Sequence, residues 1–220
     1  MFGRYPRHCT VCGHEGRFLA YGYPLVCDVL CPSCSALERH RFLALADSKQ
    51  NFFAGKDVIH FAPETCMRTY LARRSMKSYQ TADLFAPNVD LKLNIEDINL
   101  SDACADVVLC LHVLEHVDDK KATQELYRIL RPGGILIAMF PMVEGWESSY
   151  EDSTKVTPQE RLLYFGQHDH VRFFGADARR RLALPGFDVS ELTAEEPEVS
   201  RHGLMRGEKI FLCRKPSSGS

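Results

Sequence analysis

Four of the nine cysteines form two close pairs near the start of the chain, Cys9 with Cys12 and Cys31 with Cys34. The C-x-x-C spacing within each pair lets two thiolate sulfurs reach one tetrahedral ion. Gly13 follows the first pair, where a tight turn favours a small residue. The spacing predicts a zinc ribbon with four thiolate ligands. Because four protein ligands leave no open position on zinc, we expect a structural zinc and no catalytic role for it.

The second group of residues that could take part in a reaction consists of histidines. His112 follows an apolar run, and His168 and His170 flank Asp169. The pKa of histidine lies near neutrality, which suits a proton acceptor. We therefore predict that His112, His168 and His170 are catalytic and face the reacting group or its acceptor. The alternative for 168–170 is an ordinary polar loop. A metal site at His168 and His170 is less favoured because the sequence offers no evident third ligand.

The elements that would position these side chains alternate between strands and helices from residue 57 onward. Helices are predicted at 65–74 and 118–131, where apolar residues recur at helical spacing. Strands are predicted at 57–61, 78–84, 91–95, 105–111, 134–140, 187–192 and 209–214. The alternation predicts an α/β fold with a doubly wound, mostly parallel seven-stranded sheet, similar to a Rossmann fold.

The N-terminal part differs in composition from the remainder of the chain. A helix is predicted at 35–47, where Ser35 and Glu38 match a capping box. The C-terminal segment is rich in Ser, Gly and Pro, which predicts a flexible tail. We predict a zinc ribbon at 1–35, a connecting helix and linker at 36–56, a main domain at 57–215 and a tail at 216–220.

The composition limits the classes of function. The 220 residues are 45% hydrophobic and 25% charged, as in an ordinary globular protein, and the formal net charge is −2. A protein that captures nucleic acid by charge is usually basic, so that class is disfavoured. No apolar run has membrane-spanning length, and the N-terminus lacks the apolar stretch of a signal peptide. We expect a cytoplasmic protein with no membrane partner, in which reduced cysteines bind metal or are buried.

Three motifs carry a family resemblance. LHVLEHVDDKKATQELYRILRPGG at 111–134 resembles the fourth-strand region and following helix of class I S-adenosylmethionine (SAM)-dependent methyltransferases, and in particular the type 11 group. CPSCSALERHR at 31–41 and HFAPE at 60–64 resemble a bacterial subgroup with an N-terminal zinc ribbon. The resemblance implies that SAM is the cofactor, in addition to structural zinc, and that the chain is a methyltransferase.

The same resemblance implies a cofactor site at the carboxyl ends of the strands. Asp83 is expected to bind the ribose hydroxyls, and Asn94 with Ile95 to border the adenine. Ala62 stands at the first glycine of the usual glycine-rich loop, and Glu64 at the second, from where it could bind the cofactor's ammonium group. The predicted cofactor-binding residues are His60, Ala62, Pro63, Glu64, Asp83, Asn94, Ile95 and His112.

These features favour methyl transfer to an oxygen or nitrogen atom of a small-molecule acceptor. An RNA base methyltransferase, in which the ribbon grips nucleic acid, is the less favoured alternative. Its basic patch would comprise Arg39, His40, Arg41, Arg73, Arg74 and Lys77. A non-catalytic SAM-binding or interaction protein is the second alternative.

Overall fold

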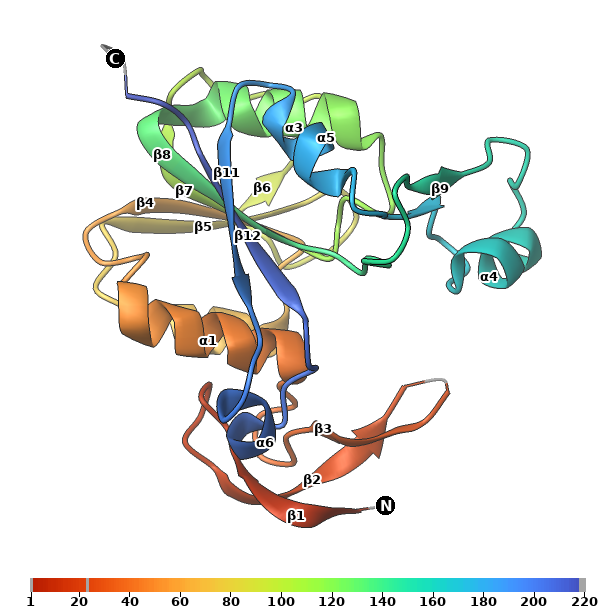
Figure 1. Cartoon of the computed structure of the whole chain (residues 1–220). Coiled ribbons are helices and arrows are strands. Elements are labelled where there is room, and N and C mark those ends of the chain that lie inside the picture. The colour runs from red at the N-terminus through yellow and green to blue at the C-terminus, as the bar shows by residue number, and fades with distance from the viewer. Residues whose placement is uncertain (1, 23, 218–220) are drawn as a thin grey trace. The chain divides into compact units, whose positions relative to one another are not determined.

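The computed structural model describes residues 2–22 and 24–217 (Figure 1). The end of the predicted tail, 218–220, lies outside the described residues. The chain divides into two compact units. Unit 1 comprises Met1–Gly55, Pro63–Lys77 and Glu191–Ile210, and unit 2 comprises Lys56–Ala62, Ser78–Ser190 and Phe211–Ser220. Both units therefore draw on residues of the predicted main domain.

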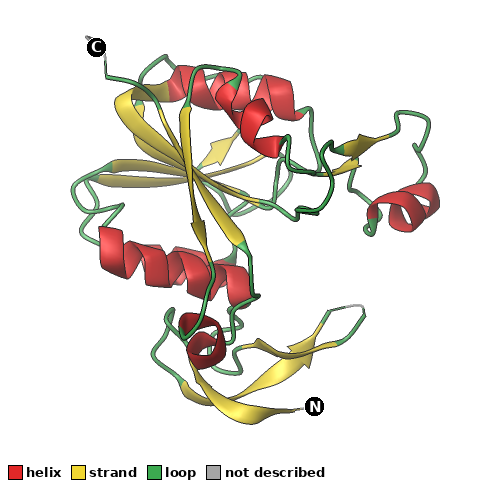
Figure 2. Cartoon of the chain, in the orientation of Figure 1, coloured by secondary structure: helices red, strands yellow, loops and turns green. Residues whose placement is uncertain are grey.

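Unit 1 begins with a small antiparallel sheet in the order β1-β2-β3 (Figure 2). Its strands are β1 (Phe2–His8), β2 (Glu15–Tyr21) and β3 (Val26–Leu30). A turn follows β1, in which the N–H of Gly13 donates to the carbonyl of Cys9 at 2.8 Å. A similar turn follows β3, where Ser35 donates to Cys31 at 2.9 Å. The sheet thus places the two C-x-x-C pairs in its turns.

The helices of unit 1 are α1 (Glu38–Gln50), α2 (Thr65–Leu71) and α6 (Glu198–His202). The predicted start of α1 is wrong. Ser35 has a φ of +58° and belongs to the turn after β3, so it does not cap the helix. Leu37 is the N-cap residue, and its backbone N–H donates to Nδ1 of His40 at 3.0 Å.

The seven-stranded sheet has the order β11-β12-β8-β7-β4-β5-β6. The strands are β4 (Asp57–Phe61), β5 (Ser78–Asp83), β6 (Leu91–Lys92), β7 (Ala105–Leu111), β8 (Leu130–Met139), β11 (Asp188–Thr193) and β12 (Lys209–Arg214). Strands β6, β5, β4, β7 and β8 are parallel, whereas β12 is antiparallel to β8. The predicted mostly parallel, Rossmann-like sheet is confirmed.

Helix α3 (Asp119–Ile129) begins where the sequence predicts, because the Asp118 side chain accepts hydrogen bonds from the N–H groups of Lys120 and Lys121. It ends two residues before the predicted end, since Leu130 already belongs to β8. Figure 1 shows α3 on the same face of the sheet as α5 (Ala178–Ala183). The buried face of α3 consists of Ala122, Leu126 and Ile129, which belong to the apolar core of unit 2.

The long connection between β8 and β11 contains elements that the sequence analysis did not predict. These are β9 (Tyr150–Glu151), α4 (Pro158–Phe165), β10 (Arg172–Phe173) and helix α5, with β9 and β10 paired antiparallel. The side chains of Thr157 and Glu160 form a capping box for α4. Among the described residues, no helix is both long and apolar enough to cross a membrane.

Candidate functional site

A cleft of about 450 Å³ lies in unit 2 at the carboxyl ends of the parallel strands. This is the edge at which open α/β sheets bind their ligands. The predicted cofactor residues that line the cleft are Ala62, Asp83, Asn94, Ile95 and His112. A hollow of about 490 Å³ in unit 1 includes none of the predicted site residues. The chemistry of the lining, rather than the volume, therefore singles out the cleft of unit 2.

Asp83 is the last residue of β5 and is positioned by its own turn. Its Oδ1 accepts hydrogen bonds from the backbone N–H groups of Phe85 and Ala86, both at 2.7 Å. Its Oδ2 makes no hydrogen bond within the described residues, so one oxygen remains for a ligand hydroxyl. Phe85 also lines the cleft and is 86% exposed, which offers an apolar surface for a flat ring. The sequence analysis did not single out Phe85.

Two other lining residues adopt an unusual backbone conformation at strand ends. Ala62 follows β4 with a φ of +48°, and His112 follows β7 with a φ of +54°. The N–H of Ala62 donates to Ala82 at 2.9 Å, and that of His112 donates to Met139 at 2.7 Å. Left-handed conformations cost non-glycine residues about 1–3 kcal/mol and are concentrated at functional sites. The backbone of Ala62 therefore has the conformation that a glycine at this position would provide.

The remaining predicted cofactor residues do not line the cleft. His60 is completely buried in β4, where Nδ1 lies 3.0 Å from the Tyr79 hydroxyl. Pro63 precedes α2, of which Glu64 is the N-cap residue. The Glu64 carboxylate pairs with Arg39 and His40. Burial opposes ionisation of Glu64, but hydrogen bonds and charge from His40 and Arg39 outweigh burial and lower its pKa to about 2.

The predicted histidines lie in different surroundings. His112 lines the cleft, and its Nδ1 is 3.2 Å from a carboxylate oxygen of Glu115. His170 is 8% exposed and lies against His116, with their ring centroids 4.7 Å apart. The His168 side chain is 70% exposed, 3.9 Å from the Asp169 carboxylate. The structure thus brings His112 and His170 to one acidic residue, Glu115, and leaves His168 at the surface.

Glu115 is a residue that sequence reasoning missed as part of the site. It is 1% exposed, although it lies in the turn after β7. Burial lowers the pKa of His170, against an opposing effect of Glu115. A neutral imidazole at physiological pH can accept a proton or bind a metal ion. The signal for Glu115 was present in the sequence as an acidic residue next to His116, a few residues beyond the mostly apolar strand β7.

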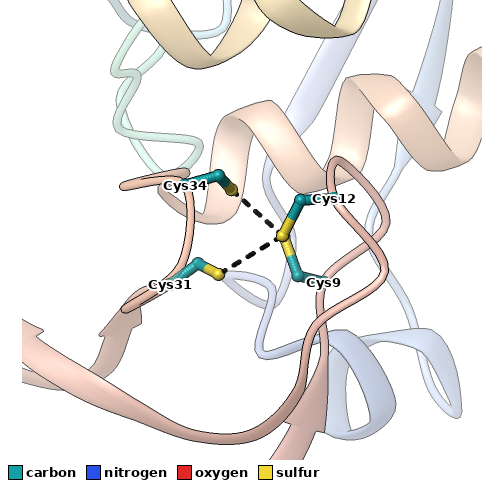
Figure 3. Close-up of side chains that lie close together, drawn as sticks. All are labelled: Cys9, Cys12, Cys31 and Cys34. Atoms are coloured by element: carbon teal, nitrogen blue, oxygen red, sulfur yellow. Dashed lines mark hydrogen bonds between the residues drawn. The ribbon is translucent and has the colours of Figure 1, made fainter.

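The four predicted zinc ligands form one cluster (Figure 3). The Sγ atoms of Cys9 and Cys34 are 3.7 Å apart, and those of Cys12 and Cys31 are 3.8 Å apart. Sulfurs bound tetrahedrally at the usual zinc–sulfur distance are separated by about 3.8 Å, whereas a disulfide requires about 2.0 Å. All nine cysteines are free thiols. The cluster therefore has the size that a four-thiolate metal site requires.

Arg41, at the end of the CPSCSALERHR motif, has a structural role in unit 1. It is completely buried, and its guanidinium donates to the carbonyls of Val29, Ala36 and Gly203 at 2.6–2.8 Å. It also lies 4.5 Å from the ring centroid of Phe18. A cation that is held in this way is not available to contact phosphates.

The parallel sheet and the cleft with Asp83 at a strand end together define a class I methyltransferase fold. Residues 54–138, which are 85 of the 220 residues, match the family model of a methyltransferase domain. A probable S-adenosylmethionine-dependent methyltransferase from Mycolicibacterium smegmatis is 39% identical over 57 residues. That match covers 25% of this chain and spans only 22% of the length of the relative.

Solved structures agree on the fold. A SAM-dependent methyltransferase from Mesorhizobium loti has a TM-score of 0.54 at 10% identity, with 74% of this chain and 92% of that chain covered. The 1,6-didemethyltoxoflavin-N1-methyltransferase of Burkholderia thailandensis, solved with bound 1,6-didemethyltoxoflavin and S-adenosylhomocysteine, has a TM-score of 0.52 at 14% identity. The matched regions are 79% of this chain and 76% of that chain. At such identities the likeness establishes the architecture of the fold.

Proposed function

We propose that the protein transfers a methyl group from SAM to an oxygen or nitrogen atom of a small-molecule acceptor. The observation that carries this proposal is the cleft at the carboxyl ends of β4, β5 and β7, with Asp83 offering a free carboxylate oxygen. SAM would place its ribose at Asp83 and its adenine near Asn94, Ile95 and Phe85. Methyl transfer from a sulfonium is a direct displacement, so the protein has mainly to align the reactants and exclude water.

The proposed acceptor side contains His112, with the 168–170 segment completing it. A carboxylate oxygen of Glu115 lies 3.2 Å from Nδ1 of His112, and its charge would stabilise the protonated imidazole. His112 would then take the acceptor proton as the methyl group is transferred. The proposal gives a supporting role to the three predicted residues that do not line the cleft, His60, Pro63 and Glu64. They would shape the loop after β4 without contacting the cofactor.

The surroundings of the predicted basic patch support a small molecule over RNA. Arg41 is completely buried, His40 is 2% exposed, and Arg39 pairs with Glu64. Arg74 pairs with Asp47, their nearest side-chain N and O atoms being 3.0 Å apart. These cations are already used within unit 1, which argues against a phosphate-binding surface built from them.

We further propose that Cys9, Cys12, Cys31 and Cys34 bind a structural zinc ion, which is supported by the spacing of their sulfurs. A hydrogen bond from Cys34 lowers the pKa of Cys9, whereas burial raises the pKa of Cys31, so the four thiols differ in how readily they ionise. A cytoplasmic location is part of the proposal, because reduced cysteines persist in that compartment.

The experiment that tests this function is transfer of labelled methyl groups from SAM. The purified protein would be incubated separately with a low-molecular-mass cell extract and with total RNA. We expect label to enter a low-molecular-mass product. Label in RNA would support the RNA alternative, and no transfer to either fraction despite cofactor binding would support the non-catalytic alternative.

A further inference from the structure

Three potential metal ligands come together beside the cofactor cleft. Glu115, His116 and His170 each place one ligand atom within 4.8 Å of the other two. Glu115 and His116 lie in the turn after β7, and His170 arrives from the segment before β10. The backbone N–H of Val171 donates to the carbonyl of Glu115 at 2.9 Å, which fixes this segment beside the turn.

Two side chains of this group, Glu115 and His170, have buried polar atoms without a hydrogen-bond partner among the described residues. Glu115 is 1% exposed, and neither of its carboxylate oxygens makes a hydrogen bond within the described residues. The same holds for Nδ1 of His170, which is 8% exposed. Buried polar groups are almost always hydrogen-bonded, paired or bound to a metal. His112 approaches one Glu115 oxygen at 3.2 Å but without hydrogen-bonding geometry, so both oxygens can serve a further partner.

A neighbouring carboxylate completes the arrangement. Oδ2 of Asp169 lies 3.2 Å from Nδ1 of His116, and Oδ1 accepts a hydrogen bond from Gln167 at 2.9 Å. A carboxylate that contacts a metal-binding histidine fixes the orientation of the ring and raises its basicity. His116 is therefore held in place by a residue that is itself anchored.

We propose that Glu115, His116 and His170 bind a divalent first-row transition-metal ion. Two imidazoles with one carboxylate suit such ions, whereas calcium and magnesium prefer oxygen ligands alone. An ion at the centre of a triangle with sides of 4.8 Å lies about 2.8 Å from each corner, so each ligand needs to move by less than about 1 Å to reach a bonding distance.

Three protein ligands leave coordination positions open for water or for an oxygen or nitrogen donor. His116 also lines the cofactor cleft, so the open side of the ion is expected to face that cleft. The site is chemically distinct from the four-thiolate cluster, and metal binding here does not depend on the proposed methyl transfer.

The proposal is tested by titrating the metal-free full-length chain with Co²⁺. Cobalt bound by four thiolates has an intense sulfur-to-metal charge-transfer absorption, which a nitrogen and oxygen site lacks. We expect wild type to bind one more Co²⁺ per chain than Glu115→Gln and His170→Gln, with the charge-transfer band equal in all three. The matched control is His168→Gln, two residues from His170 and exposed, which should keep the additional ion. Asp169→Asn should weaken its affinity about 10–100-fold.

Circular dichroism of each variant checks folding, and His170→Gln with Asp169→Asn carries the test if Glu115→Gln does not fold. The same number of bound Co²⁺ ions in wild type, Glu115→Gln and His170→Gln would overturn the proposal. So would loss of the additional ion in His168→Gln to the same extent as in His170→Gln.

Discussion

The pairing of His112 with a buried carboxylate gives a residue-level prediction about rate. His112→Gln should lower the rate of methyl transfer by about 10²–10⁴, because the acceptor proton loses its base. The affinity for S-adenosylhomocysteine, measured by calorimetry, should fall by a much smaller factor, since His112 is one of several residues lining the cleft. A methyl-transfer rate equal to that of wild type would show that His112 is not the base and has only a structural role.

Glu64 gives a residue-level prediction about pH. Its pKa in the folded state is about 2, below its ordinary value of 4.5, so the unfolded state binds more protons between these values. Ionised Glu64 therefore stabilises the fold above about pH 4.5, and this contribution is lost as the pH falls toward 2. In urea unfolding, wild type should be more stable than Glu64→Gln near pH 7, and the difference in free energy should shrink by pH 3. A difference that stays constant with pH would contradict this.

At the scale of elements, α3 allows a matched pair of substitutions on one helix. Leu126 is completely buried in the core of unit 2, whereas Gln124 is exposed two residues earlier. Leu126→Ala should lower the free energy of unfolding by about 2–5 kcal/mol, because it removes apolar contacts and leaves a cavity. Gln124→Ala should change it by less than about 0.5 kcal/mol. Equal effects in chemical denaturation would show that α3 packs with a different face.

The central strand β7 was predictable because burial on both faces produces a short apolar run, as in 107–111. The start of α1 was not predictable from its capping pattern. Ser35 matches a cap by type, but the turn that presents Cys31 and Cys34 requires a positive φ there. A tertiary requirement of the cysteine cluster thus overrides a local signal.

The lining of the cleft was partly predictable for a similar reason. Asp83, Asn94 and His112 follow strands whose carboxyl ends must meet at one edge of the sheet. The grouping of Glu115 with His170 could not be predicted from the sequence, because it depends on how the long connection after β8 folds back to the end of β7. Sequence spacing carries no information on that return path.

At the scale of the whole molecule, the cysteine cluster predicts how metal supports folding. Cys31→Ser should abolish zinc binding and loosen the sheet β1-β2-β3, because metal-binding energy in a small module is folding energy. Elemental analysis and amide hydrogen exchange would measure the two effects. The matched control is Cys27→Ser, which changes an exposed thiol outside the cluster and should leave both unchanged. Full zinc content in Cys31→Ser would contradict the four-thiolate assignment.

The central claim for the whole molecule is that the cleft of unit 2 binds the methyl donor. The most direct test is calorimetric titration of the full-length protein with S-adenosylhomocysteine, comparing wild type with Asp83→Ala and with Asp188→Ala. Asp188 is an exposed carboxylate that does not line the cleft. Loss of a charged hydrogen-bond acceptor costs about 1.5–3 kcal/mol, so Asp83→Ala should weaken binding about 10- to 100-fold while Asp188→Ala binds as wild type does. Tight binding that is unchanged by Asp83→Ala, or no binding to wild type at all, would contradict the account.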